Sequence, residues 1–196
     1  MSRPAGAPPT WTAWRPYVLT AVALLAVQTI ALHAMDLPPI CRCGYVALWH
    51  GNPSGPETSQ HIMDWYTYTH VLHGFAFYFL AWLAAPRLTT VQRFALAIGL
   101  EAGWEVFENT PMIMERYRQG ALAQGYFGDS ILNSVADTVA AVIGYILAWR
   151  APVSLVVGLA IVSELIAGYA IRDGLVLNLV QLIYPTETVS RWQAAR

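Results

Sequence analysis

Five apolar stretches constrain this chain more than any other feature of its sequence. Each approaches the roughly 20 residues that an α-helix needs to cross the hydrocarbon core of a bilayer, and the first carries no formal charge. Turn-forming residues and arginines separate the stretches, as Asp36 with Pro38 and Arg150 with Pro152 do. We therefore expect an all-α integral membrane helical bundle with five spanning helices, at about residues 16–34, 64–85, 94–109, 129–149 and 153–171.

The overall composition points the same way. Hydrophobic residues make up 56% of the chain and charged residues 12%, with a formal net charge of -1, whereas a soluble domain carries about 25% charged residues. This balance excludes a disordered chain, a coiled coil and a nucleic-acid binder that works through a basic patch. We expect one transmembrane domain over residues 1–196 that contacts the lipid bilayer. A homo-oligomer or a larger complex stays open.

Two shorter segments complete the expected fold. The stretch 174–184 contains LVLNLVQLIY, which is too short to span, so we expect a short helix at the interface or packed on the bundle. Pro111 either ends the third helix or starts a short surface helix. The loop before the second helix is rich in Pro, Gly, Asn and Ser, as in GNPSGPETSQ, and predicts irregular structure outside the bilayer.

Orientation is weakly encoded, because arginines are divided almost evenly between the two sides of the expected bundle. We predict a cytoplasmic N-terminus, since the long loop and the 110–128 loop then share the outer side. That loop holds Cys41 and Cys43. Two cysteines separated by one residue rarely reach disulfide geometry without strain, so we expect unpaired loop cysteines, with a metal or redox role as the alternative.

Ionisable residues inside the expected helices are the most informative feature for function, because such groups are costly in a bilayer and usually face a protein interior. Counting about 1.5 Å per residue from the helix ends places them in one half of the membrane. Helical spacing of three or four also puts them in stripes on single faces. The residues at this common level are His70, His73, Glu101, Glu105, Glu108, Asp129, Asn133, Asp137 and Glu164. Close helix approach is expected at Gly74, Gly99, Gly103 and Gly144.

These stripes predict one polar pocket that opens to one face of the membrane. The candidate catalytic residues are His70, His73, Glu105, Asp129 and Asp137. The other expected pocket-lining residues are Tyr66, Glu101, Glu108, Asn109, Ser130, Asn133 and Glu164. Imidazole and carboxylate groups in a helical bundle also suit a divalent metal of unspecified identity. Its candidate ligands are His70, His73 and Glu105.

Three classes of function fit such a pocket. The first is a hydrolase or transferase that acts on a lipid or lipid-linked group, with a histidine as base or metal ligand and carboxylates as acids. The second is a small proton- or ion-coupled carrier, although five helices without inverted halves make alternating access less natural. The third is a structural or accessory protein of a larger complex. Interhelical hydrogen bonds in membranes stabilise by only about 1 kcal/mol each, so packing alone explains this many polar groups poorly.

Four segments are distinctive enough to suggest a family: CRCGYVALWHGNPSGPE, SQHIMDWYTYTHVLHGFAFY, EAGWEVFENTPMIMERYR and GYFGDSILNSVADTVAAVIGY. Together, over about residues 17–170, they resemble an alphaproteobacterial family of multi-pass inner-membrane proteins of unknown function. The resemblance implies a location in the cell inner membrane and no particular activity. A looser likeness links the chain to VanZ-like membrane proteins, which also place a His near the start of one helix, a Glu pair on the next and an acidic stripe on a third.

Overall fold

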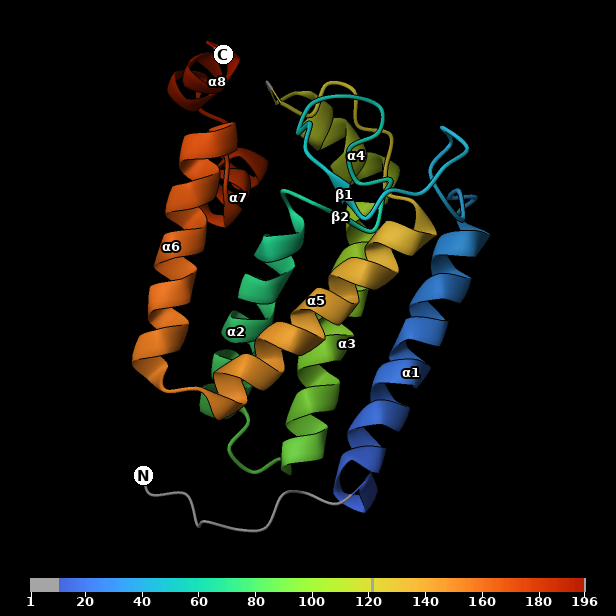
Figure 1. The fold of residues 1–196 in the computed structure, drawn as a ribbon, viewed down its shortest axis with the longest axis vertical. Helices are drawn as coiled ribbons and strands as arrows, with labels where there is room; N and C mark the ends of the chain where they lie inside the picture. The colour runs from blue at the N-terminus through green and yellow to red at the C-terminus, as the bar shows by residue number, and fades with distance from the viewer. Residues whose placement is uncertain (1–10, 121, 196) are drawn as a thin grey trace.

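The computed structural model describes residues 11–120 and 122–195 (Figure 1). This part of the chain forms helices and one two-stranded parallel sheet. In chain order the elements are α1 (Trp11–Ala34), β1 (Trp49–His50), β2 (Met63–Asp64), α2 (Thr67–Ala84), α3 (Thr90–Glu108), α4 (Pro111–Arg118), α5 (Ile131–Arg150), α6 (Val153–Ile171), α7 (Leu175–Ile183) and α8 (Glu187–Ala194). The predicted all-α class is confirmed. The first helix was predicted from residue 16 but begins at Trp11, and the part of the predicted cytoplasmic N-terminus before residue 11 lies outside the described residues.

By length and composition, three of the described helices could cross a membrane: α1 from Thr12, α5 and α6. The sequence predicted five, and α2 and α3 do not meet this criterion. The reason is their polar content, because α2 carries two histidines and α3 carries three glutamates and an arginine. The residues that make the predicted pocket therefore also lower the apolar character of the helices that carry it.

Close contact between α2 and α5 forms the centre of the bundle, with α1 and α3 to one side and α6 at the other edge (Figure 1). A Cβ added at Gly74 of α2 would lie 2.6 Å from the backbone nitrogen of Tyr145, and one added at Gly144 of α5 would lie 2.9 Å from the carbonyl carbon of Val71. These two glycines allow the two backbones to meet, as predicted. Gly103 of α3 has no described atom within 4 Å of such a Cβ, so the prediction there is wrong.

The start of α3 lies earlier than predicted because of a reciprocal cap. The Thr89 hydroxyl accepts a hydrogen bond from the Gln92 backbone N–H, and the Gln92 side chain accepts one from the Thr89 backbone N–H. Arg93, which the prediction placed in a connection, is helical. Its guanidinium folds back and donates to the carbonyl oxygens of Ala85 and Pro86 at the end of α2.

The loop between α1 and α2 is fastened to the start of α5. The Ile131 backbone N–H donates to the carbonyl of Pro38, and the Ser130 backbone N–H donates to the carbonyl of Ser59. These bonds occupy N–H groups that the first turn of a helix leaves without an intrahelical partner. The predicted irregular loop is thus held against the bundle, and its two short strands pair within it.

Two further features of the fold differ from the prediction. Cys41 and Cys43 form a disulfide, so the expectation of unpaired cysteines is wrong; their Cα atoms lie 5.1 Å apart, within the usual range for a bridge. Helix α8 was not predicted, because its sequence ETVSRWQA is polar and short. Helix α7 was expected at 174–184 and lies at Leu175–Ile183.

Candidate functional site

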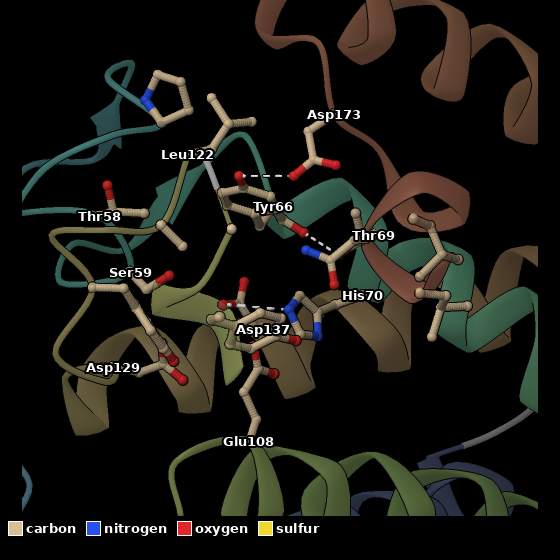
Figure 2. Close-up of a pocket in the computed structure, with 18 of the residues that line it drawn as sticks. Thr58, Ser59, Tyr66, Thr69, His70, Glu108, Leu122, Asp129, Asp137 and Asp173 are labelled. Carbon is tan, nitrogen blue, oxygen red and sulfur yellow. Dashed lines mark hydrogen bonds and ion pairs between the residues drawn. The ribbon is translucent and has the colours of Figure 1, made fainter. Parts of the chain in front are cut away.

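A cavity of about 90 Å³ lies at the end of the bundle that carries the small sheet, α4 and α7. Its wall combines α2, α3, α5, α7 and Gln193 of α8 with the segments around residues 53–59, 117–120 and 122–126. The predicted site residues in that wall are Tyr66, His70, His73, Glu108, Asp129 and Asp137. Figure 2 shows His70 and Asp137 side by side in this cavity, with Tyr66 and Asp173 across from them.

His70 is the centre of the polar cluster. Its Nδ1 lies 2.6 Å from Glu101 Oε1 and 3.1 Å from Glu105 Oε1, and its Nε2 lies 3.8 Å from Asp137 Oδ2. Glu101 also reaches the second histidine, since its Oε2 lies 3.0 Å from His73 Nδ1. Three helices thus bring two imidazoles and three carboxylates together. Glu101 and Glu105 lie behind the cavity wall, with Glu101 between the two rings.

A chain of hydrogen bonds connects this cluster to α1. The Ser134 hydroxyl donates to Glu105 Oε2 at 2.7 Å, and the Gln28 amide donates to that same hydroxyl at 2.8 Å. The Gln28 side-chain oxygen accepts from the hydroxyl of Thr138. Sequence reasoning missed Gln28. Its signal was a lone amide inside the apolar run LLAVQTIAL.

Asp129 is tied into the protein through both of its oxygens. Asn109 donates to Oδ2 at 2.6 Å, the Tyr126 hydroxyl donates to Oδ1 at 2.9 Å, and the Asp129 backbone N–H donates back to Asn109 Oδ1. Burial raises the pKa of Asp129 to about 7, and the negative charge of Glu105 adds to this. The geometry indicates that Asp129 and Asn109 chiefly join the turn before α5 to the end of α3.

Besides Glu101 and Asn109, three predicted pocket-lining residues lie outside the cavity wall. Ser130 caps α5, accepting from the Asn133 backbone N–H, and the Asn133 side chain donates to the carbonyl of His61 in the loop. Glu164 accepts from the backbone N–H groups of Leu175 and Val176 and so caps α7. The sequence placed all three at the correct end of the bundle, but it could not show that their side chains form hydrogen bonds with backbone groups.

Asp173 is a cavity residue that the sequence did not single out. It follows α6 in the Arg172-Asp173-Gly174 turn, and its Oδ2 accepts a hydrogen bond from the Tyr66 hydroxyl at 3.1 Å. Burial raises the pKa of Asp173 to about 6. A charged turn after an apolar helix gave no sign that the chain folds back over the cavity.

Two acceptor atoms in the cluster make no hydrogen bond. Within the described part of the chain these are Asp137 Oδ1 and Glu105 Oε1, of which Glu105 Oε1 has an ion-pair contact to His70 Nδ1 at 3.1 Å. The Asp137 side chain is 5% exposed and lines the cavity. An unsatisfied buried acceptor costs about 1–3 kcal/mol, so the cavity favours an occupant that offers a proton or positive charge. The described lining contains no arginine or lysine.

A second group of candidate metal-ligating side chains, in the loop, is structural. His61 Nδ1 accepts from the Ala47 backbone N–H, which leaves Nε2 to donate to Glu57 Oε2 at 3.1 Å. The neighbouring Cys41 and Cys43 are joined as a disulfide. A cysteine binds metal as a thiolate, so this group offers no metal site while the bridge is intact.

Three helices long and apolar enough to cross a membrane suggest a membrane protein, and the buried, acid-rich cavity gives it an interior polar site. The chain belongs to the family described as Protein of unknown function (DUF2585), which matches residues 32–195. It is similar to UPF0314 proteins from several alphaproteobacteria, so the family expected from the sequence motifs is confirmed. No solved structure matches the chain, and the comparisons do not show the likeness to VanZ-like proteins.

Three of these relatives illustrate the similarity. A UPF0314 protein of Rhizobium etli is 46% identical over 177 residues, which cover 90% of this chain and 91% of the relative. One from Paracoccus denitrificans is 46% identical over 187 residues, covering 95% and 93%. One from Brucella anthropi is 44% identical over 186 residues, covering 95% and 94%. The match therefore spans nearly the whole of each protein.

Proposed function

We propose that this protein is a membrane-embedded enzyme, a hydrolase or transferase that acts on a lipid or lipid-linked group. The observation that carries the proposal is Asp137, a buried carboxylate on the cavity wall with one oxygen that has no donor among the described residues. His70 stands beside its other oxygen. A buried carboxylate with a free lone pair next to an imidazole suits general acid–base chemistry.

The chemistry assigned to these groups is proton transfer. Asp137 Oδ1 accepts the proton of a water or alcohol, whose oxygen bonds to the electrophilic centre of the substrate. The bond from that centre to the leaving oxygen breaks, and the leaving oxygen takes the proton from the newly protonated Asp137. His70 positions Asp137 from its Oδ2 side, and Glu101 and Glu105 contact the other ring nitrogen of His70, Nδ1.

The cavity lining favours a neutral or cationic reacting group. Glu108, Asp129, Asp137 and Asp173 contribute carboxyl groups, and no arginine or lysine lies among the described lining residues to pair with a phosphate. A hydroxylated, ester or amine-bearing headgroup therefore fits the lining better than a phosphate does.

We also propose that all five long helices cross the cell inner membrane, with the N-terminus in the cytoplasm. Support comes from packing, since α2 and α3 direct their histidines and glutamates at one another inside the bundle. The Cys41–Cys43 disulfide supports the orientation, because disulfides persist in oxidising compartments. These cysteines are the only two in the chain. After reduction, a membrane-impermeant maleimide should label them in intact spheroplasts; labelling only after lysis would reverse the orientation.

The activity is tested on lipids. Purified protein is incubated in detergent with a total lipid extract from an alphaproteobacterium, and mass spectrometry compares the lipids before and after. We expect the wild type to convert at least one lipid species. Asp137→Asn should convert it at least 100-fold more slowly. Glu187→Gln, on the exposed surface of α8, is the matched control and should keep the wild-type rate. If none of the three proteins changes the lipid profile from that before incubation, the enzyme is refuted. Proton-coupled uptake by vesicles would then favour a carrier.

A further inference from the structure

We propose that His70, His73 and Glu101 bind one divalent transition-metal ion at the inner wall of the cavity. This deepens the proposed function by naming a cofactor for it, and it rests on that function only for what the metal does. The binding itself is argued from geometry. One ligand atom from each of the three residues lies within 4.8 Å of the other two.

The distances fit a site that closes on itself by hydrogen bonds when it holds no ion. Both His–Glu101 contacts use Nδ1, at 2.6 Å and 3.0 Å, and each takes a different carboxylate oxygen. Ligands about 2.1 Å from a tetrahedral metal lie roughly 3.4 Å apart. Insertion of an ion would therefore spread these contacts by less than about 1 Å, which side-chain rotation can supply.

The surroundings of His70 also match those of a metal-ligating histidine. Such a residue usually offers its second ring nitrogen to a carboxylate, which fixes the ring and its tautomer. With Nδ1 toward the metal, His70 Nε2 faces Asp137 Oδ2 at 3.8 Å, which is longer than a hydrogen bond, so a small movement of the ring must complete this contact. Asp137 Oδ1, which makes no hydrogen bond among the described residues, and Glu105 Oε1, which lies 3.1 Å from His70 Nδ1, are two further oxygen acceptors in the same cluster.

Access to the cavity leaves room for an exchangeable ligand. His70 and His73 line the cavity, whereas Glu101 is fully buried behind them. Three protein ligands with one side open to a cavity are the arrangement of catalytic metal sites, in which water or substrate takes the remaining position. Two imidazoles and a carboxylate suit zinc or iron rather than magnesium or calcium.

The test uses the full-length protein in detergent, stripped with a chelator and titrated with Co²⁺. We expect one equivalent to bind and to give the visible absorption of a tetrahedral or five-coordinate site. The Trp104 ring lies 6.2 Å from the His73 ring, so bound Co²⁺ should also quench Trp104 fluorescence. In Trp104→Phe that quenching should fall while the visible absorption persists.

Variants separate the ligands from their neighbours. His73→Ala and Glu101→Gln should each weaken Co²⁺ binding at least tenfold, and Asp137→Asn should weaken it by roughly 10–100-fold as a positioning residue. His33→Ala and Glu115→Gln remove a histidine and a glutamate from the surface and should bind as the wild type does. Unfolding temperatures measured in parallel identify any variant that fails to fold.

The outcome for the wild type decides the inference even if a variant misfolds. No binding of Co²⁺ or Zn²⁺ by the folded wild type would overturn it, as would equal affinity in folded His73→Ala and Glu101→Gln. Lipid conversion by a metal-free protein would overturn the role of the metal as a cofactor and leave the enzyme standing. Stoichiometric metal binding without lipid conversion would refute the enzyme and leave the metal site standing.

Discussion

A methyl group at Gly144 should separate the two helices that hold the site. The added Cβ would lie 2.9 Å from the carbonyl carbon of Val71 and nearer still to its oxygen, whereas carbon atoms in ordinary contact are about 3.5–4.0 Å apart. Backbone atoms cannot rotate aside as a side chain can. Relief therefore requires α2 and α5 to move apart by about 1 Å, which carries His70 away from Asp137.

Overpacking of this kind costs about 1–3 kcal/mol, so Gly144→Ala should unfold at a lower temperature in detergent and bind Co²⁺ more weakly. Gly103→Ala is the matched control, because no described atom lies within 4 Å of its added methyl. It should be neutral or more stable by up to about 1 kcal/mol, since alanine is the better helix former. If the two variants unfold at the same temperature, the close approach at Gly144 does not hold the bundle together.

Three other changes test separate parts of the network. Gln28→Ala removes a buried amide that donates to Ser134 and should destabilise the protein by about 1–2 kcal/mol in thermal unfolding; an unchanged melting temperature would argue against the link to α1. Because burial raises the pKa of Asp173 from 3.8 to about 6, the folded state binds more protons than the unfolded chain across that window. The free energy of unfolding should therefore fall by up to about 3 kcal/mol as the pH rises through this window, and it should stay level above about pH 6. Asp173→Asn should lose this slope in denaturant titrations at several pH values. If that variant keeps the slope, Asp173 is not its source. Glu164→Gln weakens the cap of α7 by about 1 kcal/mol, so the Leu175 amide should exchange its hydrogen about fivefold faster; unaltered exchange there would show that the cap is held otherwise.

The helices were predictable because their signals are local. Apolar runs fixed the class and most boundaries, and helical spacing put His70 and His73 on one face of α2 and the glutamates on one face of α3. What spacing could not give is the relative height of two helices. Glu101 and Glu105 differ by about one turn, or roughly 6 Å, and only the crossing of α2 with α3 places Glu101 between both histidines.

The remaining differences arise from long-range contacts. Ser130 and Asn133 look like pocket residues in the sequence, yet they hold a loop whose partner carbonyls lie about 70 positions earlier in the chain. Gln28 reaches across to α5 from a stretch of α1 that carries no charged residue between Pro16 and Leu32. No periodic pattern encodes such pairs, because each depends on where another segment has already folded.

The helices that line the cavity are not all attached equally firmly to the rest of the protein. α2 and α5 interlock through their backbones at Gly74 and Gly144. The α7 side, in contrast, is attached by the amides that Glu164 accepts, by the Tyr66–Asp173 hydrogen bond, and by Arg116 of α4, which donates to the carbonyl oxygens of Leu182 and Ile183. Displacing α7 breaks those few bonds and leaves the imidazoles undisturbed. A ligand larger than the cavity would thus enter past α7. Ligand entry then depends on α7, whereas the chemistry depends on α2 and α5.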